Sequence, residues 1–232
     1  MSGVKSTAKS AVTNPATSTA ESATESTTQT TTKATVKSRR EQYSEATRAA
    51  LLEAAARRFT DHGFAATALE DVATDIQATR GAVYHHFANK TALFRAVYED
   101  TEKAMLKRVE QAAAQHPDDP AAAADAALEM FLECCCEPVY GRVVWQEAPV
   151  ALGWKEWKAS EERHAFGLIE QTISTLIHIG KLPPLPVTTL ARSVFHLLGS
   201  AGIDLALTAE PDKARVKDEY LQVLRYLLGR RP

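Results

Sequence analysis

The pattern of polar and apolar residues changes near residue 40, where a polar segment is followed by regularly spaced apolar positions. Residues 1–40 are mainly Ser, Thr, Ala and Lys, with almost no large apolar side chains. Such a segment buries too little surface to offset the entropy of ordering, so we predict a disordered basic tail. Beyond it, apolar residues recur at spacings of three and four, and no alternating strand pattern occurs. This periodicity predicts an all-α fold.

The first long helix is expected from about Ser44 to His62. Gly63 follows directly and is placed to end it, because glycine readily adopts the left-handed conformation found there. The inner stripe consists of apolar residues at helical spacing: Leu51, Leu52, Ala55 and Phe59.

Two short helices are expected next, at residues 68–77 and 79–87. Thr67 precedes Glu70 by three residues, the spacing of a capping box, and Thr79 is suited to cap the second short helix. The pattern predicts two helices that meet across a tight turn.

The second short helix is expected to expose its polar and small residues. Val83 and Phe87 lie four residues apart and should point inward. The outer face then carries Arg80, Gly81, Ala82 and His85. A short helix, a turn and a second helix with a small, polar start predict a helix-turn-helix that inserts its second helix into the major groove of DNA.

These residues resemble the DNA-binding signature of TetR-type transcriptional regulators, closely over about residues 44–98. The most specific piece is Tyr-x-His-Phe-x-x-Lys at 84–90. The resemblance assigns the hydroxyl and ammonium groups of Thr79, Tyr84 and Lys90 to phosphates, and Arg80 is suited to pair with a guanine. The predicted DNA-binding residues are Thr67, Thr79, Arg80, Gly81, Ala82, Tyr84, His85 and Lys90.

The turn departs from that family's pattern. The family usually reads Ala-Gly-Val where this chain has Ile76-Gln77-Ala78. Glycine suits the positive φ that such a turn can need, and Gln77 adopts it at some cost.

From Asn89 onward the pattern predicts further helices. One helix from Asn89 to about Gln115 should connect the DNA-binding domain, residues 41–90, to a helical ligand-binding and dimerisation domain, residues 91–232. Proline and glycine then divide the chain into expected helices at 121–137, 140–147, about 154–180, 187–208 and 211–229.

Aromatic residues concentrate between residues 131 and 166, where Pro138, Pro149 and Gly153 interrupt the helices. Interrupted bundles pack imperfectly and host apolar pockets, although any one of these side chains could equally belong to a filled core. The predicted site for a small apolar effector comprises Phe131, Cys135, Tyr140, Arg142, Trp145, Trp154 and Phe166.

The last long helices are predicted to form the interface of a homodimer. Both are rich in apolar residues, and Gly199, Ala201 and Gly202 permit close approach of helices. A two-fold dimer would present two recognition helices to a palindromic DNA operator. The predicted interface residues are Ile173, Leu190, Val194, Leu198, Ala201, Gly202 and Leu205.

Three adjacent cysteines, Cys134, Cys135 and Cys136, permit two interpretations. Neighbouring side chains on a helix diverge by about 100°, so the three cannot share one face. Small core residues are the simpler interpretation, and a thiol-based sensor of oxidants or soft metals is the alternative. His62, His85 and His86 lack the spacing of a metal site, so no metal is expected.

A formal net charge of −2 predicts modest nonspecific affinity for DNA unless the positive groups cluster. They do cluster around the recognition helix and just ahead of the first helix. No cofactor motif, catalytic constellation, secretory signal or membrane span is evident, so we expect a cytoplasmic non-enzyme. The predicted function is a homodimeric, effector-released repressor that binds double-stranded DNA, with a ligand-independent DNA-binding adaptor as the alternative.

Overall fold

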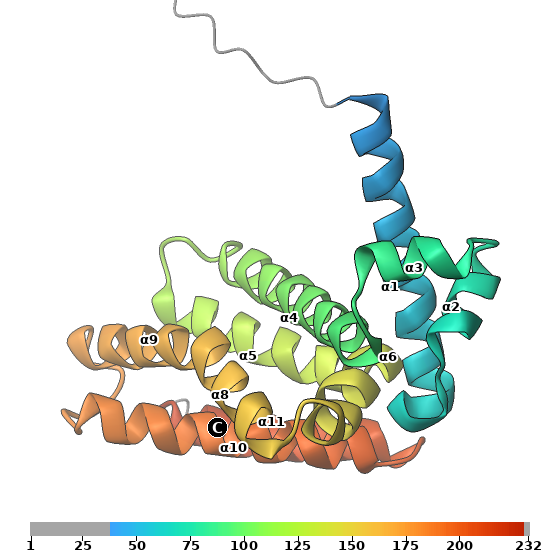
Figure 1. The fold of residues 1–232 in the computed structure, drawn as a ribbon. Coiled ribbons are helices and arrows are strands. Elements are labelled where there is room, and N and C mark those ends of the chain that lie inside the picture. The colour runs from blue at the N-terminus through green and yellow to red at the C-terminus, as the bar shows by residue number, and fades with distance from the viewer. Residues whose placement is uncertain (1–37, 230–232) are drawn as a thin grey trace, which may run out of the picture. The chain divides into compact units, whose positions relative to one another are not determined.

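The computed structural model describes residues 38–229, and within that range the only regular secondary structure is helical (Figure 1). The N-terminal helices are α1 (Arg39–Ala66), α2 (Leu69–Asp75), α3 (Arg80–His86), α4 (Lys90–Ala113) and α5 (Pro120–Cys136). Short and π-helical segments follow: α6 (Pro138–Tyr140), η1 (Gly141–Glu147), α7 (Ala148–Ala151), α8 (Trp154–Glu161) and η2 (Glu162–Phe166). The last helices are α9 (Gly167–His178), α10 (Val187–Leu207) and α11 (Asp212–Leu227). The all-α prediction is confirmed.

Helix α1 begins at Arg39 rather than at the predicted Ser44. The Ser38 side chain accepts the backbone N–H of Glu41 at 3.3 Å, and the Glu41 carboxylate accepts the N–H of Ser38 at 2.8 Å. This capping box lies ahead of the first apolar residue and therefore outside the periodic pattern. Of the predicted tail, Arg39 and Arg40 belong to the helix and Ser38 caps it, and residues 1–37 lie outside the described part of the chain.

The inner face of α1 is buried as predicted, at Leu51, Leu52, Ala55 and Phe59. Phe59 and Phe64 both meet Phe94 of α4 edge-on, with ring centroids 5.0 Å and 5.3 Å apart. Gly63 has a φ of 78° and breaks the regular helix, as its sequence position predicts. This aromatic group fixes α4 against the end of α1.

Helix α2 is held to α1 by an arginine. Arg58 donates from Nε and Nη2 to the two carboxylate oxygens of Asp75, at 2.6 Å and 2.8 Å. Its Nη1 also lies 3.4 Å from Asp71. The hydrogen bond from Arg58 lowers the pKa of Asp75 below its ordinary value. This two-pronged pair sets the position of α2, and with it the helix-turn-helix.

The turn between α2 and α3 closes with the two hydrogen bonds of a Schellman motif. The N–H of Ala78 donates to the carbonyl of Ala73 at 2.9 Å, and that of Gln77 to the carbonyl of Thr74 at 3.0 Å. Gln77 has a φ of 54°, so the positive φ expected of this turn falls on a residue with a side chain.

Replacing Gln77 with glycine should raise the free energy of unfolding by up to about 1 kcal/mol, because the left-handed conformation costs a non-glycine residue about 1–2 kcal/mol. Urea unfolding of both proteins measures the change. Ala78→Gly is the matched control, since Ala78 has no positive φ and should lose stability. Equal losses in both variants would contradict the strain at Gln77.

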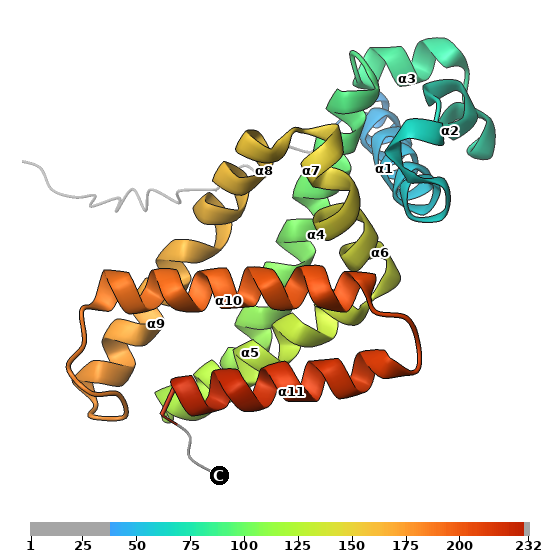
Figure 2. The ribbon, with the colours of Figure 1, turned by 90° about the horizontal axis from the view of Figure 1, so that it is seen from below.

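Helix α10 packs against α5, α9, η1 and α11, and Figure 2 shows α10 and α11 running side by side. It is long and apolar enough to cross a membrane, judged by length and composition alone. The core helix of a bundle has the same composition, and the side chains of Ala191, Val194, Ala201 and Leu205 are buried against the other helices of this chain.

Candidate functional site

Helix α3 presents an open face next to α2. Its N-terminus is capped as predicted, because Thr79 Oγ1 accepts the N–H of Ala82 at 3.2 Å. Val83 is fully buried beneath it, whereas Gly81 and His85 are exposed. A Cβ placed on Gly81 would meet only Thr79 Oγ1, at 3.8 Å. The backbone of α3 is therefore accessible to a bulky partner over its first turn.

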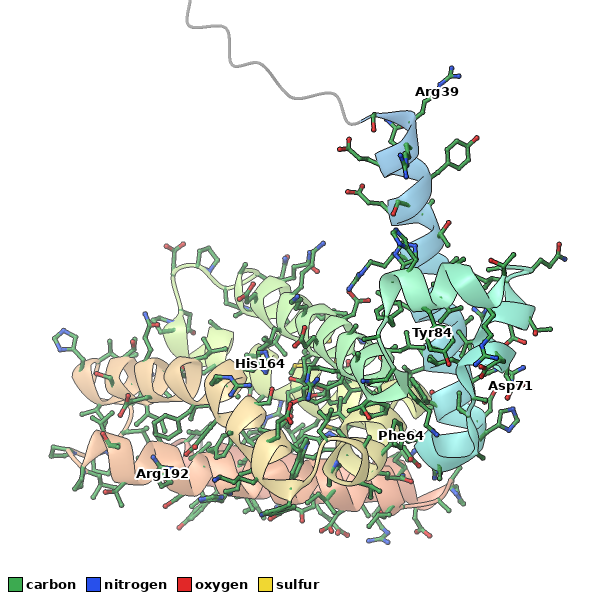
Figure 3. The ribbon with its side chains drawn as sticks, in the orientation of Figure 1. Arg39, Phe64, Asp71, Tyr84, His164 and Arg192 are labelled. Carbon is green, nitrogen blue, oxygen red and sulfur yellow. The ribbon has the colours of Figure 1, made fainter. Side chains whose placement is uncertain are left out.

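Arg80 and Tyr84 share an acidic neighbour on α2. Arg80 Nε lies 3.1 Å from Glu70 Oε1, and the Tyr84 hydroxyl donates to the same oxygen at 3.4 Å. The Arg80 guanidinium also stacks over the Tyr84 ring, 5.3 Å from its centroid. Both side chains remain exposed, and Figure 3 labels Tyr84 on this face. Glu70 thus orients the two predicted DNA contacts and would compete with DNA for Arg80.

Helix α1 carries further positive groups, of which Arg48 lies next to the end of α3. Arg48 stacks over the ring of Phe87, 5.4 Å from its centroid. Arg39 and Arg40 are exposed in the first turn of α1, where Figure 3 labels Arg39. The pKa of His86 is lowered, first by burial and then by the neighbouring His85 and Arg48.

Contrary to the sequence prediction, Thr67 is not the N-cap residue of α2. Its side chain is only 2% exposed, and its hydroxyl donates to the carbonyl of Gly63 at 2.9 Å. The residue that caps α2 is Ala68, whose N–H donates to Asp71 at 3.4 Å. The prediction that Thr67 caps α2 is wrong, and its buried hydroxyl is not accessible to DNA.

The side chain of Lys90 forms hydrogen bonds with the end of α1. Its ammonium group donates to the carbonyls of Phe64 at 2.8 Å and Ala65 at 3.1 Å, and lies 4.5 Å from the centroid of the Phe64 ring. These carbonyls lack partners within the helix, so a cation there satisfies them. Lys90 thus has a structural role at the end of α1, and its contact with a DNA phosphate stays a prediction.

Lys90→Met should retain the ring contact but lose the hydrogen bonds to both carbonyls, which lowers the free energy of unfolding by about 1–3 kcal/mol. Chemical unfolding measures this loss, and exposed Lys103 on the same helix supplies the control substitution to Met. A flattened salt dependence of DNA binding with unchanged stability would contradict the structural role and support the phosphate contact instead.

A cavity of about 370 Å³ opens among α4, α5, η1, α8, α9 and α10. The predicted effector residues that line it are Phe131, Tyr140, Trp145 and Trp154. Trp145 and Trp157 are buried and meet edge-on with ring centroids 5.9 Å apart, while Trp154 is 60% exposed at the margin. The structure thus brings four of the predicted residues to one cavity, and their contact with a ligand stays a prediction.

The other predicted effector residues, Cys135, Arg142 and Phe166, do not line the cavity. Cys135 is buried in the core of the bundle, and Phe166 packs behind the wall against the ring of Phe195, 6.1 Å away. Arg142 turns to Glu147, with Nη2 2.7 Å from Oε1. These three positions are corrections to the predicted site.

The cysteine triplet has the properties of core residues. Cys134 and Cys135 are buried, and burial raises the pKa of all three thiols, that of Cys134 to about 11. A reactive thiol needs the opposite shift, toward the thiolate. Among residues 38–229, no group of three or more His, Cys, Asp or Glu side chains is arranged to hold a metal ion. The sensor interpretation therefore gains no support.

Sequence reasoning missed two acidic residues on the cavity wall, Glu102 and Glu161. The signal was present on α4, where Glu102 follows Tyr98 by four residues and precedes Met105 by three. All three side chains point to the buried side. A charged residue within an apolar helical stripe marks a site that requires explanation.

A polar contact joins α1 to η1. The N–H of Phe64 donates to Glu147 Oε2 at 2.8 Å, and Arg142, paired with Glu147, donates to Gln146 at 2.8 Å. Gln146 in turn donates to the carbonyl of Ala206 at the end of α10, at 2.6 Å. A hydrogen-bonded chain therefore runs from the base of the helix-turn-helix to α10, independently of α4.

The predicted dimer-interface residues face the interior of the chain. Leu190 and Leu198 are half-buried, and the remainder are buried: Ile173, Val194, Ala201, Gly202 and Leu205. This apolar stripe packs against the other helices of the same chain and leaves these five positions unavailable to a partner. The large apolar side chains exposed at the C-terminal end of this region are instead Leu207, Val223, Tyr226 and Leu227.

A capped helix-turn-helix followed by a helical bundle with an internal cavity is the architecture of a one-component transcription regulator. Residues 51–97 match the family of bacterial regulatory proteins named after tetR, and residues 121–230 match the tetracyclin repressor-like C-terminal domain. The chain belongs to the TetR family.

Two curated relatives match the helix-turn-helix region. The probable acrEF/envCD operon repressor of Escherichia coli strain K12 is 46% identical over 52 residues, which are 22% of this chain and 24% of that protein. The HTH-type transcriptional regulator TtgR of Pseudomonas putida is 43% identical over 61 residues, 26% of this chain and 29% of that protein. The chain thus spans less than a third of either relative's length.

The likeness in three dimensions is more extensive. The crystal structure of a TetR-family transcriptional regulator from Pectobacterium atrosepticum superposes with a TM-score of 0.68 at 28% identity. The superposition covers 83% of this chain and 96% of that one. The shared fold therefore includes both the helix-turn-helix and the bundle.

Proposed function

We propose that the protein is a cytoplasmic, homodimeric repressor that binds a palindromic operator through α3. The observation that carries this proposal is the open first turn of α3, where Gly81 leaves room for the groove edge and Arg80 and Tyr84 flank it. The small residues permit close approach, and the flanking arginine supplies a group suited to a guanine edge.

The dimer interface that we propose uses the outer side of α10 and α11. Exposed Leu207, Val223, Tyr226 and Leu227 supply apolar side chains of the kind that interfaces bury. The buried stripe of α10 supports this face from behind. A two-fold arrangement through these helices would set two α3 helices on one side of the DNA.

The cavity is the proposed effector site, and two connections lead from it to the helix-turn-helix region, one to the end of α3 and one to the end of α1. Helix α4 carries cavity residues at Met105 and Val109 and continues back to the end of α3. Trp145 lines the cavity on η1, and Glu147 of the same helix holds the N–H of Phe64. An effector that binds better to the arrangement incompatible with DNA would release the operator.

The proposal is tested by selecting bound duplexes from a random pool and measuring transcription from a promoter that contains the selected site. The expected result is an enriched inverted repeat and transcription that falls as the protein is added. The ligand-independent adaptor predicts the same repeat, but a bundle to which no small molecule binds. Failure to enrich any sequence would contradict both functions.

A further inference from the structure

The cavity contains two carboxyl groups within an otherwise largely apolar and aromatic wall. Glu102 on α4 is 1% exposed, and its Oε1 makes no hydrogen bond of good geometry, although the neighbouring Tyr140 hydroxyl lowers its pKa against the effect of burial. Glu161 on α8 is also buried and accepts the Tyr98 hydroxyl at 2.6 Å. A buried acid whose oxygen lacks a partner is costly, so its retention at a cavity surface points to a ligand.

The surroundings of the pair disfavour its own negative charge. Burial raises the pKa of Glu102 well above its ordinary value, and the charge of Glu161 raises it further. Burial raises the pKa of Glu161 to about 7, against the opposing effect of the hydrogen bond from Tyr98. A positive charge placed between the two carboxyls would relieve both effects and favour their ionised forms.

The basic residues of the cavity wall act elsewhere. Lys158 and His196 also line the cavity. Their charges act on Glu162, whose pKa is lowered first by the hydrogen bond from Arg192. Within the part of the chain described here, no cation contributes to the pKa of Glu102 or Glu161. Among residues 38–229, neither carboxyl is therefore paired with a positive side chain.

The aromatic wall adds a second attraction for positive charge. Trp145 meets the rings of Tyr140 and Trp157, and Trp154 meets Trp157 with ring centroids 4.9 Å apart. Indole and phenol faces attract cations, most strongly where water is excluded. Both Trp145 and Trp157 are buried beside the cavity.

We propose that the cavity binds a hydrophobic organic cation, whose charged group lies between Glu102 and Glu161 and whose apolar part packs on Trp145 and Trp157. This inference rests on the proposed role of the cavity as the effector site. It deepens that role by naming the charge of the ligand.

The test compares two probes of the same shape, the cation benzyltrimethylammonium and the neutral neopentylbenzene. Titration calorimetry on the full chain at pH 7.5 should show the cation binding at least about tenfold more tightly, from ion pairing and ring contacts. In the Glu102→Gln, Glu161→Gln double variant the part of this preference that comes from ion pairing should be lost, leaving only the contribution of the rings, with the neutral probe unaffected. Glu99→Gln, an exposed site on α4, is the matched control.

The pH dependence supplies a second readout. Because the pair is partly protonated near pH 7, binding the cation should release protons, and its affinity should rise between pH 6 and 8. The other titratable groups facing the pair are Tyr98, Tyr140, Cys135 and His164, of which the first three are kept protonated by burial. His164→Gln should leave the pH dependence in place.

Equal or tighter binding of the neutral probe, an unchanged preference in the double variant, or no binding of the cation at millimolar concentration would overturn the proposal. If circular dichroism shows that the double variant does not fold, the single variant Glu102→Gln replaces it. The preference of this variant for the cation is then compared with that of the unaltered protein. Binding of the selected DNA is measured separately. A cation that binds without changing DNA affinity contradicts effector release but leaves this inference intact.

Discussion

Gly81→Glu should lower the affinity for the selected operator by at least about 100-fold, because a like charge forced against the phosphates costs several kcal/mol. The fold should tolerate the change. A Cβ at this position has no neighbour closer than 3.8 Å, and glutamate favours a helix more than glycine does. Fluorescence anisotropy with labelled duplex measures the affinity, and thermal unfolding measures the stability.

Gly167→Glu provides the matched control for this substitution. Gly167 likewise lies in the first turn of a helix, α9, and has nothing within 4 Å of an added Cβ. The same charge there should leave DNA affinity nearly unchanged. Similar losses in the two variants would mean that net charge, and not the face of α3, governs binding.

Trp145→Ala should lower the free energy of unfolding by about 3 kcal/mol, within the range for large-to-small substitutions in a core. Its ring is buried, meets Phe131, Tyr140 and Trp157 edge-on, and lies against Gly202 of α10. For a folded region of this size the melting temperature should fall by roughly 6–12 °C. Scanning calorimetry of the two proteins gives the difference.

The contact with Gly202 offers an internal check on that prediction. A Cβ on Gly202 would lie 2.3 Å from the Trp145 ring, so Gly202→Ala alone should cost about 1–3 kcal/mol. In the Trp145→Ala background the ring is gone, and the same substitution should be neutral or stabilising. Additive losses in the double variant would show that the two residues do not pack as described.

The helix-turn-helix was readable from sequence because local signals agree there. Thr79 caps α3 directly, Val83 points inward at helical spacing, and the turn carries its positive φ at Gln77. Each of these features depends on residues within a few positions of one another. Local chemistry therefore decided most of this region without knowledge of the tertiary fold.

The contacts of Thr67 and Lys90 that sequence reasoning did not predict have a common physical cause. Both side chains are polar and adjoin the recognition region, but the break at Gly63 brings unpaired carbonyls of α1 to them. Thr67 bonds to Gly63 itself and Lys90 to Phe64 and Ala65. Spacing along the sequence does not reveal where a broken helix directs its carbonyl groups.

The cavity was predictable in most of its aromatic residues but not in its polar ones. Arg142 lies three residues before Trp145, which in an α-helix would place them near one face. The segment is π-helical, and its wider turn separates them, so that Arg142 pairs with Glu147. The apolar stripe of α10 was likewise visible in the sequence. The sequence pattern does not show whether such a stripe packs within its own chain or against a second chain.

The central claim is that α3 reads a specific DNA sequence, and an equilibrium titration of the selected duplex tests it most directly. Anisotropy is measured with that duplex and with a scrambled duplex of the same composition, at one physiological salt concentration. We predict a preference of at least about 1,000-fold for the selected sequence. Equal affinity for the two duplexes would contradict the claim.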